Sequence, residues 1–193
     1  MMRGSTVRSR SVLAIACSIL VASCSFGTES SANRLGDDRR IEIGGPDDGI
    51  PRPVEPIIVY LIRGDEVVSR PRLSLSPLTP QSIIDSLASG LSEFELANDL
   101  RSSLSISPLV IENSRLNSDV AEISVSSTFL DLAGSEQRLL LAQVVLSLFK
   151  NLDISSVRVL SDEVDVAVPG ASGEVLERPL LASDYSSLIG SLT

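Results

Sequence analysis

The 193-residue sequence contains no histidine and no tryptophan, and its only two cysteines are Cys17 and Cys24. Without histidine the chain cannot build a Ser-His-Asp triad, use imidazole as an acid or base, or hold zinc through imidazole nitrogen. Its few aromatic residues offer little surface on which bases or sugars could stack. These absences favour a protein that is not an enzyme.

Motifs of nucleophilic and phosphate chemistry are also missing. Serine is abundant, yet no string of Gly, any residue, Ser, any residue, Gly marks a nucleophile elbow. The sequence also has no Gly-rich loop of the kind that cradles phosphates. We therefore predict no catalytic residue, no cofactor and no metal site.

The first 23 residues have the layout of a secretory signal peptide. Arg3, Arg8 and Arg10 precede an apolar run from Val12 to Ala22, and the segment holds no acidic residue. The run has about half of the roughly 20 residues that a membrane-spanning helix needs, so a permanent transmembrane anchor is the weaker alternative. We expect this leader to be cleaved.

Val21, Ala22, Ser23 and Cys24 resemble the bacterial lipobox, in which small residues precede a lipid-carrying cysteine. The resemblance implies cleavage before Cys24 and a diacylglycerol thioether, with acyl chains such as palmitate, on its sulfur. Two or more acyl chains give lasting membrane attachment. We expect a lipoprotein at the extracytoplasmic face of the cell membrane; the alternative is an ordinary signal peptide followed by an incidental cysteine.

The chain that remains after cleavage is strongly acidic. Loss of the three leader arginines leaves 13 basic against 25 acidic residues, a balance that repels nucleic acid and bare anionic lipid. Residues 24–53 are rich in Ser, Gly and Asp without a sustained apolar period, which is typical of a flexible tether. We therefore predict a signal peptide over 1–23, a tether over 24–53 and one folded domain over 54–193.

The folded domain opens with a predicted hairpin. Residues 57–62 are β-branched and aromatic, and Val67 and Val68 follow after a short break, so we predict two strands with Pro71 marking the end of pairing. The intervening Arg63-Gly64-Asp65 also spells an integrin-binding motif. A turn is the interpretation we favour, because Gly and Asp are what a hairpin turn requires.

Two helices are predicted next. Thr79 and Pro80 have the residue types of an N-cap and a first helical position, and apolar residues recur at helical spacing from Ile83 to Leu91. Ser92 and Glu95 form the pattern of a capping box, which predicts a second, shorter helix.

The remainder predicts strands around one long helix. Strands are expected at 109–111, at 121–126 with one wet face, and in a last hairpin between 157 and 168. The longest helix is expected over 136–151, where a polar stripe predicts a helix mostly buried but open on one side. The stripe consists of Gln143, Ser147, Lys150 and Asn151. We predict an α+β single domain: a mixed β-sheet with two main helices packed on one face.

The order of these elements and several local strings resemble the sporulation and spore germination domain called GerMN. The matching strings are Val59–Gly64, Leu100–Ser102, Val125–Phe129, Ala142–Leu148, Val164–Pro169 and Asp184–Tyr185. The sequence departs from the family where a Gly commonly turns the last hairpin, having Asp162 and Glu163 instead, and where its helix end is rich in leucine. The resemblance implies assembly at the cell surface, in some relatives during spore formation, rather than catalysis.

Our leading hypothesis is a non-catalytic interaction or assembly module of the cell envelope, anchored through Cys24 and binding an envelope or secreted protein. The alternative is a module for cell-wall glycan or a small ligand, or a cryptic carboxylate hydrolase. Such a hydrolase would use Asp162, Glu163 and Asp165, since two positioned carboxylates suffice for glycoside hydrolysis. At a hairpin tip, solvated turn acids are the plainer interpretation.

Overall fold

The computed structural model describes residues 53–191. The predicted signal peptide, Cys24 and residues 24–52 of the predicted tether lie outside the described residues, so these assignments stay predictions. Over the range that is described, no helix is both long enough and apolar enough to cross a membrane.

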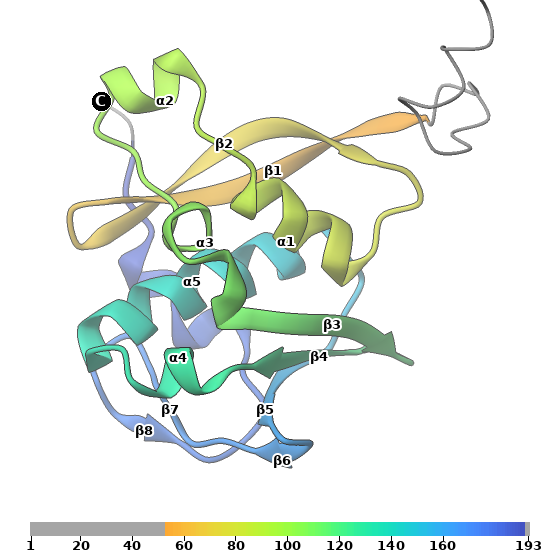
Figure 1. The fold of residues 1–193 in the computed structure, drawn as a ribbon, viewed down its shortest axis with the longest axis vertical. Coiled ribbons are helices and arrows are strands. Elements are labelled where there is room, and N and C mark those ends of the chain that lie inside the picture. Colours follow the sequence, from red (N-terminus) through yellow and green to blue (C-terminus); the bar gives the residue numbers. More distant parts are fainter. Residues whose placement is uncertain (1–52, 192–193) are drawn as a thin grey trace, which may run out of the picture. The chain divides into compact units, whose positions relative to one another are not determined.

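The described chain alternates strands and helices as an α+β domain (Figure 1). The strands are β1 (Val54–Arg63), β2 (Glu66–Leu75), β3 (Ile111–Asn117), β4 (Val120–Val125), β5 (Ser156–Ser161), β6 (Val164–Asp165), β7 (Val168–Pro169) and β8 (Val175–Leu176). The helices are α1 (Pro80–Ala88), α2 (Glu93–Ala97), α3 (Ser103–Ile106), α4 (Ser127–Leu130) and α5 (Gly134–Asn151), with 3₁₀ turns η2 (Pro108–Val110), η3 (Ala182–Asp184) and η4 (Ser186–Leu188).

The central sheet is mixed, which confirms the predicted fold class. Its order is β3-β4-β5-β6, with β4 and β5 parallel and the other two pairs antiparallel. The β1–β2 and β7–β8 pairs form separate two-stranded sheets. The two longer helices are α1 and α5, and Figure 1 shows α5 running between the β1–β2 hairpin and the four-stranded sheet. One hydrophobic core joins these layers.

The helix starts form as their capping residues predict. The Thr79 hydroxyl accepts the N–H of Ser82, and the Ser82 hydroxyl accepts the N–H of Thr79, so two free donors at the start of α1 are satisfied. Ser92 and Glu95 make the same reciprocal pair at the start of α2. The strand predicted at 109–111 begins only at Ile111, because Pro108 starts the 3₁₀ turn η2.

The prediction that Pro71 ends strand pairing is wrong. Strand β2 continues to Leu75, and Pro71 lies opposite Ile58. The N–H and C=O of Ile58 point away from β2, toward the side chain of Asn151. Pairs of this kind exchange no backbone hydrogen bonds, so the missing N–H of Pro71 falls on the outer edge of the hairpin, where proline is tolerated.

The predicted open side of α5 is also wrong. Gln143 and Ser147 are buried, and of the four stripe residues only Lys150 is exposed. The buried part of the stripe lies along the edge of β1 and beside α3: Ser147 Oγ accepts the N–H of Tyr60 at 2.9 Å, and the Gln143 amide binds Ser102 Oγ and the N–H of Ser103. The polar side chains thus satisfy backbone groups that water would otherwise have to reach.

Candidate functional site

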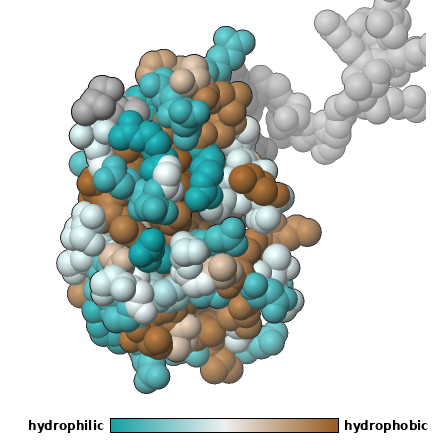
Figure 2. Space-filling view, turned by 90° about the vertical axis from the view of Figure 1, so that its left-hand side faces the viewer, coloured by the Kyte–Doolittle hydropathy of each residue, from teal (hydrophilic) through white to brown (hydrophobic). Residues whose placement is uncertain are grey.

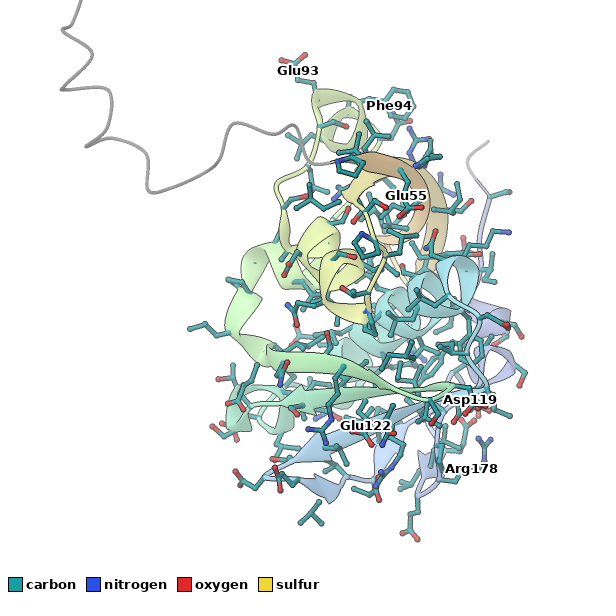
Figure 3. All side chains as sticks on the ribbon, turned by 90° about the vertical axis from the view of Figure 1, so that its right-hand side faces the viewer. Glu55, Glu93, Phe94, Asp119, Glu122 and Arg178 are labelled. Carbon is teal, nitrogen blue, oxygen red and sulfur yellow. The ribbon has the colours of Figure 1, made fainter. Side chains whose placement is uncertain are left out.

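The outer face of the four-stranded sheet carries a row of alternating charges, one from each strand. Glu122 on β4 lies between Arg115 on β3 and Arg158 on β5, and Arg158 also binds Asp165 on β6. The closest nitrogen–oxygen distances along this ion row are 2.6, 3.2 and 2.6 Å. Figure 3 shows Glu122 on the strands in the lower half of the view. The strand register brings the charges of the ion row together, since Arg115, Glu122 and Arg158 are direct cross-strand neighbours.

The ion row holds its carboxylates in the charged form. The Arg115 side chain, helped by Asn117, lowers the pKa of Glu122, and the Arg158 guanidinium lowers that of Asp165. Every other carboxyl of the described chain with a shifted pKa is also lowered: Glu95, Glu174 and Asp184. A general acid at neutral pH needs a raised pKa. These carboxylates are therefore suited to binding and to structure.

The acids that the hydrolase alternative would use lie in and beside an exposed turn. Asp162 and Glu163 form the exposed turn between β5 and β6, while the carboxylate of Asp165 is held by Arg158. Within residues 53–191, no group of three or more His, Cys, Asp or Glu side chains is placed to hold a metal ion.

A cleft of about 370 Å³ opens beside the ion row. Its charged lining comes from Arg158, Asp165, Glu177 and Arg178, over an apolar floor that includes Leu180. Arg178 binds the carboxylate of Asp184 at 2.7 Å. Of the two carboxylates that line the cleft, Asp165 is bound by Arg158, whereas Glu177 forms no ion pair with any residue of the described range 53–191. Nothing in the sequence indicated that Arg158 and Arg178 lie at one cleft, because they are brought together by the antiparallel bridge between Val157 and Leu180, which are 23 residues apart in the chain.

Hydrophobic side chains reach the surface in several places among hydrophilic ones (Figure 2). One such surface, called here the hairpin face, is made by three opposed pairs: Val54 with Leu75, Pro56 with Leu73, and Ile58 with Pro71. Directly opposed residues, and residues two apart along a strand, share a face. Val54 is 56% exposed, Leu73 66% and Leu75 47%, so the face is apolar and open.

The family model for sporulation and spore germination, called Germane, matches residues 58–166, from β1 to β6. The chain belongs to the Germane family. This confirms the resemblance to GerMN drawn from the sequence. The match includes the whole ion row, whereas the cleft and the hairpin face extend beyond its limits.

A solved structure is also similar to this Germane-family chain: the tandem GerMN domains of the sporulation protein GerM from Bacillus subtilis. The two share 19% identity with a TM-score of 0.45, over 66% of this chain and 45% of that one. The chain thus spans less than half of the GerM structure. Among proteins with curated descriptions, none matches this sequence.

Proposed function

We propose that this Germane-family protein is a non-catalytic interaction module that binds another protein of the cell envelope. It is anchored through lipid on Cys24 at the extracytoplasmic face of the membrane. The family associates the domain with sporulation and germination. The observation that carries the proposal is the open hairpin face, because contiguous exposed apolar surface marks sites of contact with other molecules.

Charge narrows the choice of partner. Residues 53–191 hold 19 acidic and 9 basic side chains, so two copies of the domain repel one another. The same charge repels anionic lipid, which favours a neutral or basic protein over either a second copy or the membrane surface. Pro56 and Pro71 lack the N–H groups that an added strand would use, so the partner contacts this face through side chains.

The chemistry of the described carboxylates supports a non-catalytic role. Their shifted pKa values are all lowered by arginine or hydrogen-bond partners, and none has the environment of a proton donor at neutral pH. The cleft beside the ion row favours one second candidate, a module that binds a wall glycan or another polar small ligand. Arginine and carboxylate groups over an apolar floor can orient such a ligand.

Site-specific photo-crosslinking tests the proposal. A photoreactive phenylalanine replaces Leu73 or Leu75 in the full-length protein, expressed in its native envelope, and Val164 on β6 serves as the control because it is 67% exposed. We expect a defined protein adduct from both hairpin positions and none from Val164. Absence of any adduct, or equal adducts from all three positions, contradicts the proposal.

The glycan candidate and the anchor have separate tests. Binding of soluble wall fragments that is lost in Arg178→Ala, with folding retained, favours the glycan candidate over a protein partner. Mass spectrometry of the native product tests the anchor. We expect an N-terminal Cys24 bearing acyl chains, and an unmodified polypeptide contradicts the lipid attachment.

A further inference from the structure

A second exposed apolar surface lies where three short elements, α3, η2 and α4, meet. It consists of Ile106 from α3, Leu109 from η2 and Leu130 from α4, which are 70%, 80% and 45% exposed. Element η2 contacts both α3 and α4, and the N–H of Ser126 donates to the C=O of Val110 at 3.0 Å. These three residues are called the rim below.

The rim stands beside a cavity of about 140 Å³. Its apolar lining includes Ile106, Val110 and Leu140, of which the last two are fully buried, and Ser107, which is half-buried, also lines it. Pockets that hold metabolites have volumes of roughly 300 Å³ or more. The cavity is therefore too small for such a ligand and is of a size for one aliphatic side chain.

Charge around the rim is acidic. Glu112 follows η2 and Asp131 follows α4 in the chain, while Glu136 lines the cavity itself. The basic residue that lines the cavity is Arg101. A second copy brings the same acids to the contact, so charge complementarity selects a basic partner.

The secondary structure of the rim favours a helix over a β-strand as the partner's docking element. An added β-strand needs a free strand edge, and the rim is built from two α-helical turns and a 3₁₀ turn instead. An amphipathic helix needs only an apolar surface around a cavity. It inserts one side chain into the cavity, and its side chains one turn away cover the surrounding surface.

We propose that the rim is a docking site for a basic amphipathic helix of a partner protein, which inserts one aliphatic side chain into the cavity. The proposal rests on the function proposed above, that this chain binds proteins. It adds a second contact surface, the chemistry of the helix that fits it, and the residue type that anchors that helix.

The test uses the full-length protein and a labelled 18-residue peptide of leucine and lysine, with leucines at helical spacing, in a fluorescence anisotropy titration. We expect Leu109→Ser to weaken binding about tenfold, because anchor contacts around a filled pocket carry most of the affinity. The matched control is Val164→Ser, which removes a similarly exposed apolar side chain from β6, outside both the rim and the hairpin face, and leaves binding unchanged.

Two further measurements address the cavity and the charge. Ser107 lines the cavity, so Ser107→Phe introduces a ring that occupies its space while all three rim residues are kept, and we expect a loss as large as that of Leu109→Ser. A peptide with glutamate in place of lysine is expected to bind at least tenfold more weakly than the lysine peptide. Thermal melts of each variant establish that the fold is intact.

The proposal is overturned if Val164→Ser weakens binding as much as Leu109→Ser, if Ser107→Phe binds like the parent, or if both peptides bind equally. It is also overturned if the lysine peptide does not bind. If the lysine peptide does not bind but Leu73 and Leu75 give adducts in the crosslinking experiment, the proposed function still stands. If the peptide does not bind and no adducts form, the proposed function is overturned as well.

Discussion

The side-chain amide of Asn151 binds both backbone polar groups of Ile58: its Oδ1 accepts the N–H at 2.9 Å and its Nδ2 donates to the C=O at 2.7 Å. The last residue of α5 thus takes the place of a neighbouring strand at the edge of β1. Ser147 does the same for the N–H of Tyr60, and Arg101 pairs with Ile62 through two backbone bonds of 2.8 Å. A hairpin of only two strands is marginal alone, and this row of bonds attaches it to the core.

Replacing Asn151 by alanine is predicted to destabilise the protein by about 2 kcal/mol, since two half-buried backbone groups lose their partners. Asn151→Asp is expected to cost nearly as much, because a carboxylate can accept the Ile58 N–H but cannot donate to its C=O. Urea unfolding measures both. The control is the exposed neighbour, Lys150→Ala, and an Asn151→Ala variant as stable as this control contradicts the edge-capping role.

Local signals in the sequence predicted the parts of the fold that local contacts determine. The capping pairs at Thr79 and Ser92 and the turn at Gly64 form between residues close in the chain, and the structure confirms them. The polar stripe on α5 was misread because its partner, the edge of β1, lies 87 and 93 residues away for Ser147 and Asn151. A polar stripe looks the same in sequence whether it faces water or an unpaired strand edge.

The candidate surfaces were less predictable for the same reason. Alternation along β4 predicted that Glu122 lies on a wet face, and this is wrong: Glu122 is only 4% exposed, because the arginines of the neighbouring strands cover it. That Arg158 stands beside it follows from the parallel pairing of β4 with β5, which the helix α5 connects across the sheet. The rim was not predicted at all, because α3 and α4 are single turns whose four residues are too few for a helical period to show.

The turn between β5 and β6 contains removable strain. Asp162 and Glu163 have φ values of 50° and 65°, in the left-handed region that glycine adopts freely. We expect Glu163→Gly to stabilise the protein by about 0.5 to 1 kcal/mol, and Glu163→Ala, which keeps a Cβ, to give no such gain. Thermal or urea unfolding of the two variants decides this. A glycine variant less stable than the alanine variant contradicts the explanation.

A buried ion pair is predicted to make stability depend on pH. Arg72 on β2 binds Glu95 of α2 through two bonds of 2.9 and 3.1 Å, beside Arg70, whose guanidinium lies 4.4 Å from the centre of the Phe94 ring. Burial raises the pKa of Glu95, but the bonds to Arg72 and Ser92 outweigh it and the pKa ends below its usual 4.5. Because the folded pKa is the lower one, this stabilisation is complete above about pH 4.5 and is lost as the pH falls through the folded pKa.

Glu95→Gln is therefore expected to flatten the fall in unfolding free energy below about pH 4.5. Arg72→Met leaves the carboxylate buried without its partner and is expected to cost about 3 kcal/mol at pH 7. Urea titrations at several pH values measure both effects, with the exposed Glu93→Gln as the control. Parallel pH profiles for Glu95→Gln and the parent contradict the assignment.

The ion row on the outer face of the sheet predicts a dependence on salt. In Glu122→Gln the guanidinium groups of Arg115 and Arg158 remain on either side of a neutral residue, so two like charges face each other without the carboxylate that separated them. We expect lower stability than the parent. The difference should shrink as salt rises, since the guanidinium groups of Arg115 and Arg158 reach solvent, where charges are screened over about 10 Å at 0.1 M ionic strength. Unfolding in urea at low and high sodium chloride measures this, with Glu177→Gln, an exposed carboxylate outside the row, as the control. A deficit in Glu122→Gln that is the same at both salt concentrations means that the carboxylate acts through packing and not through charge.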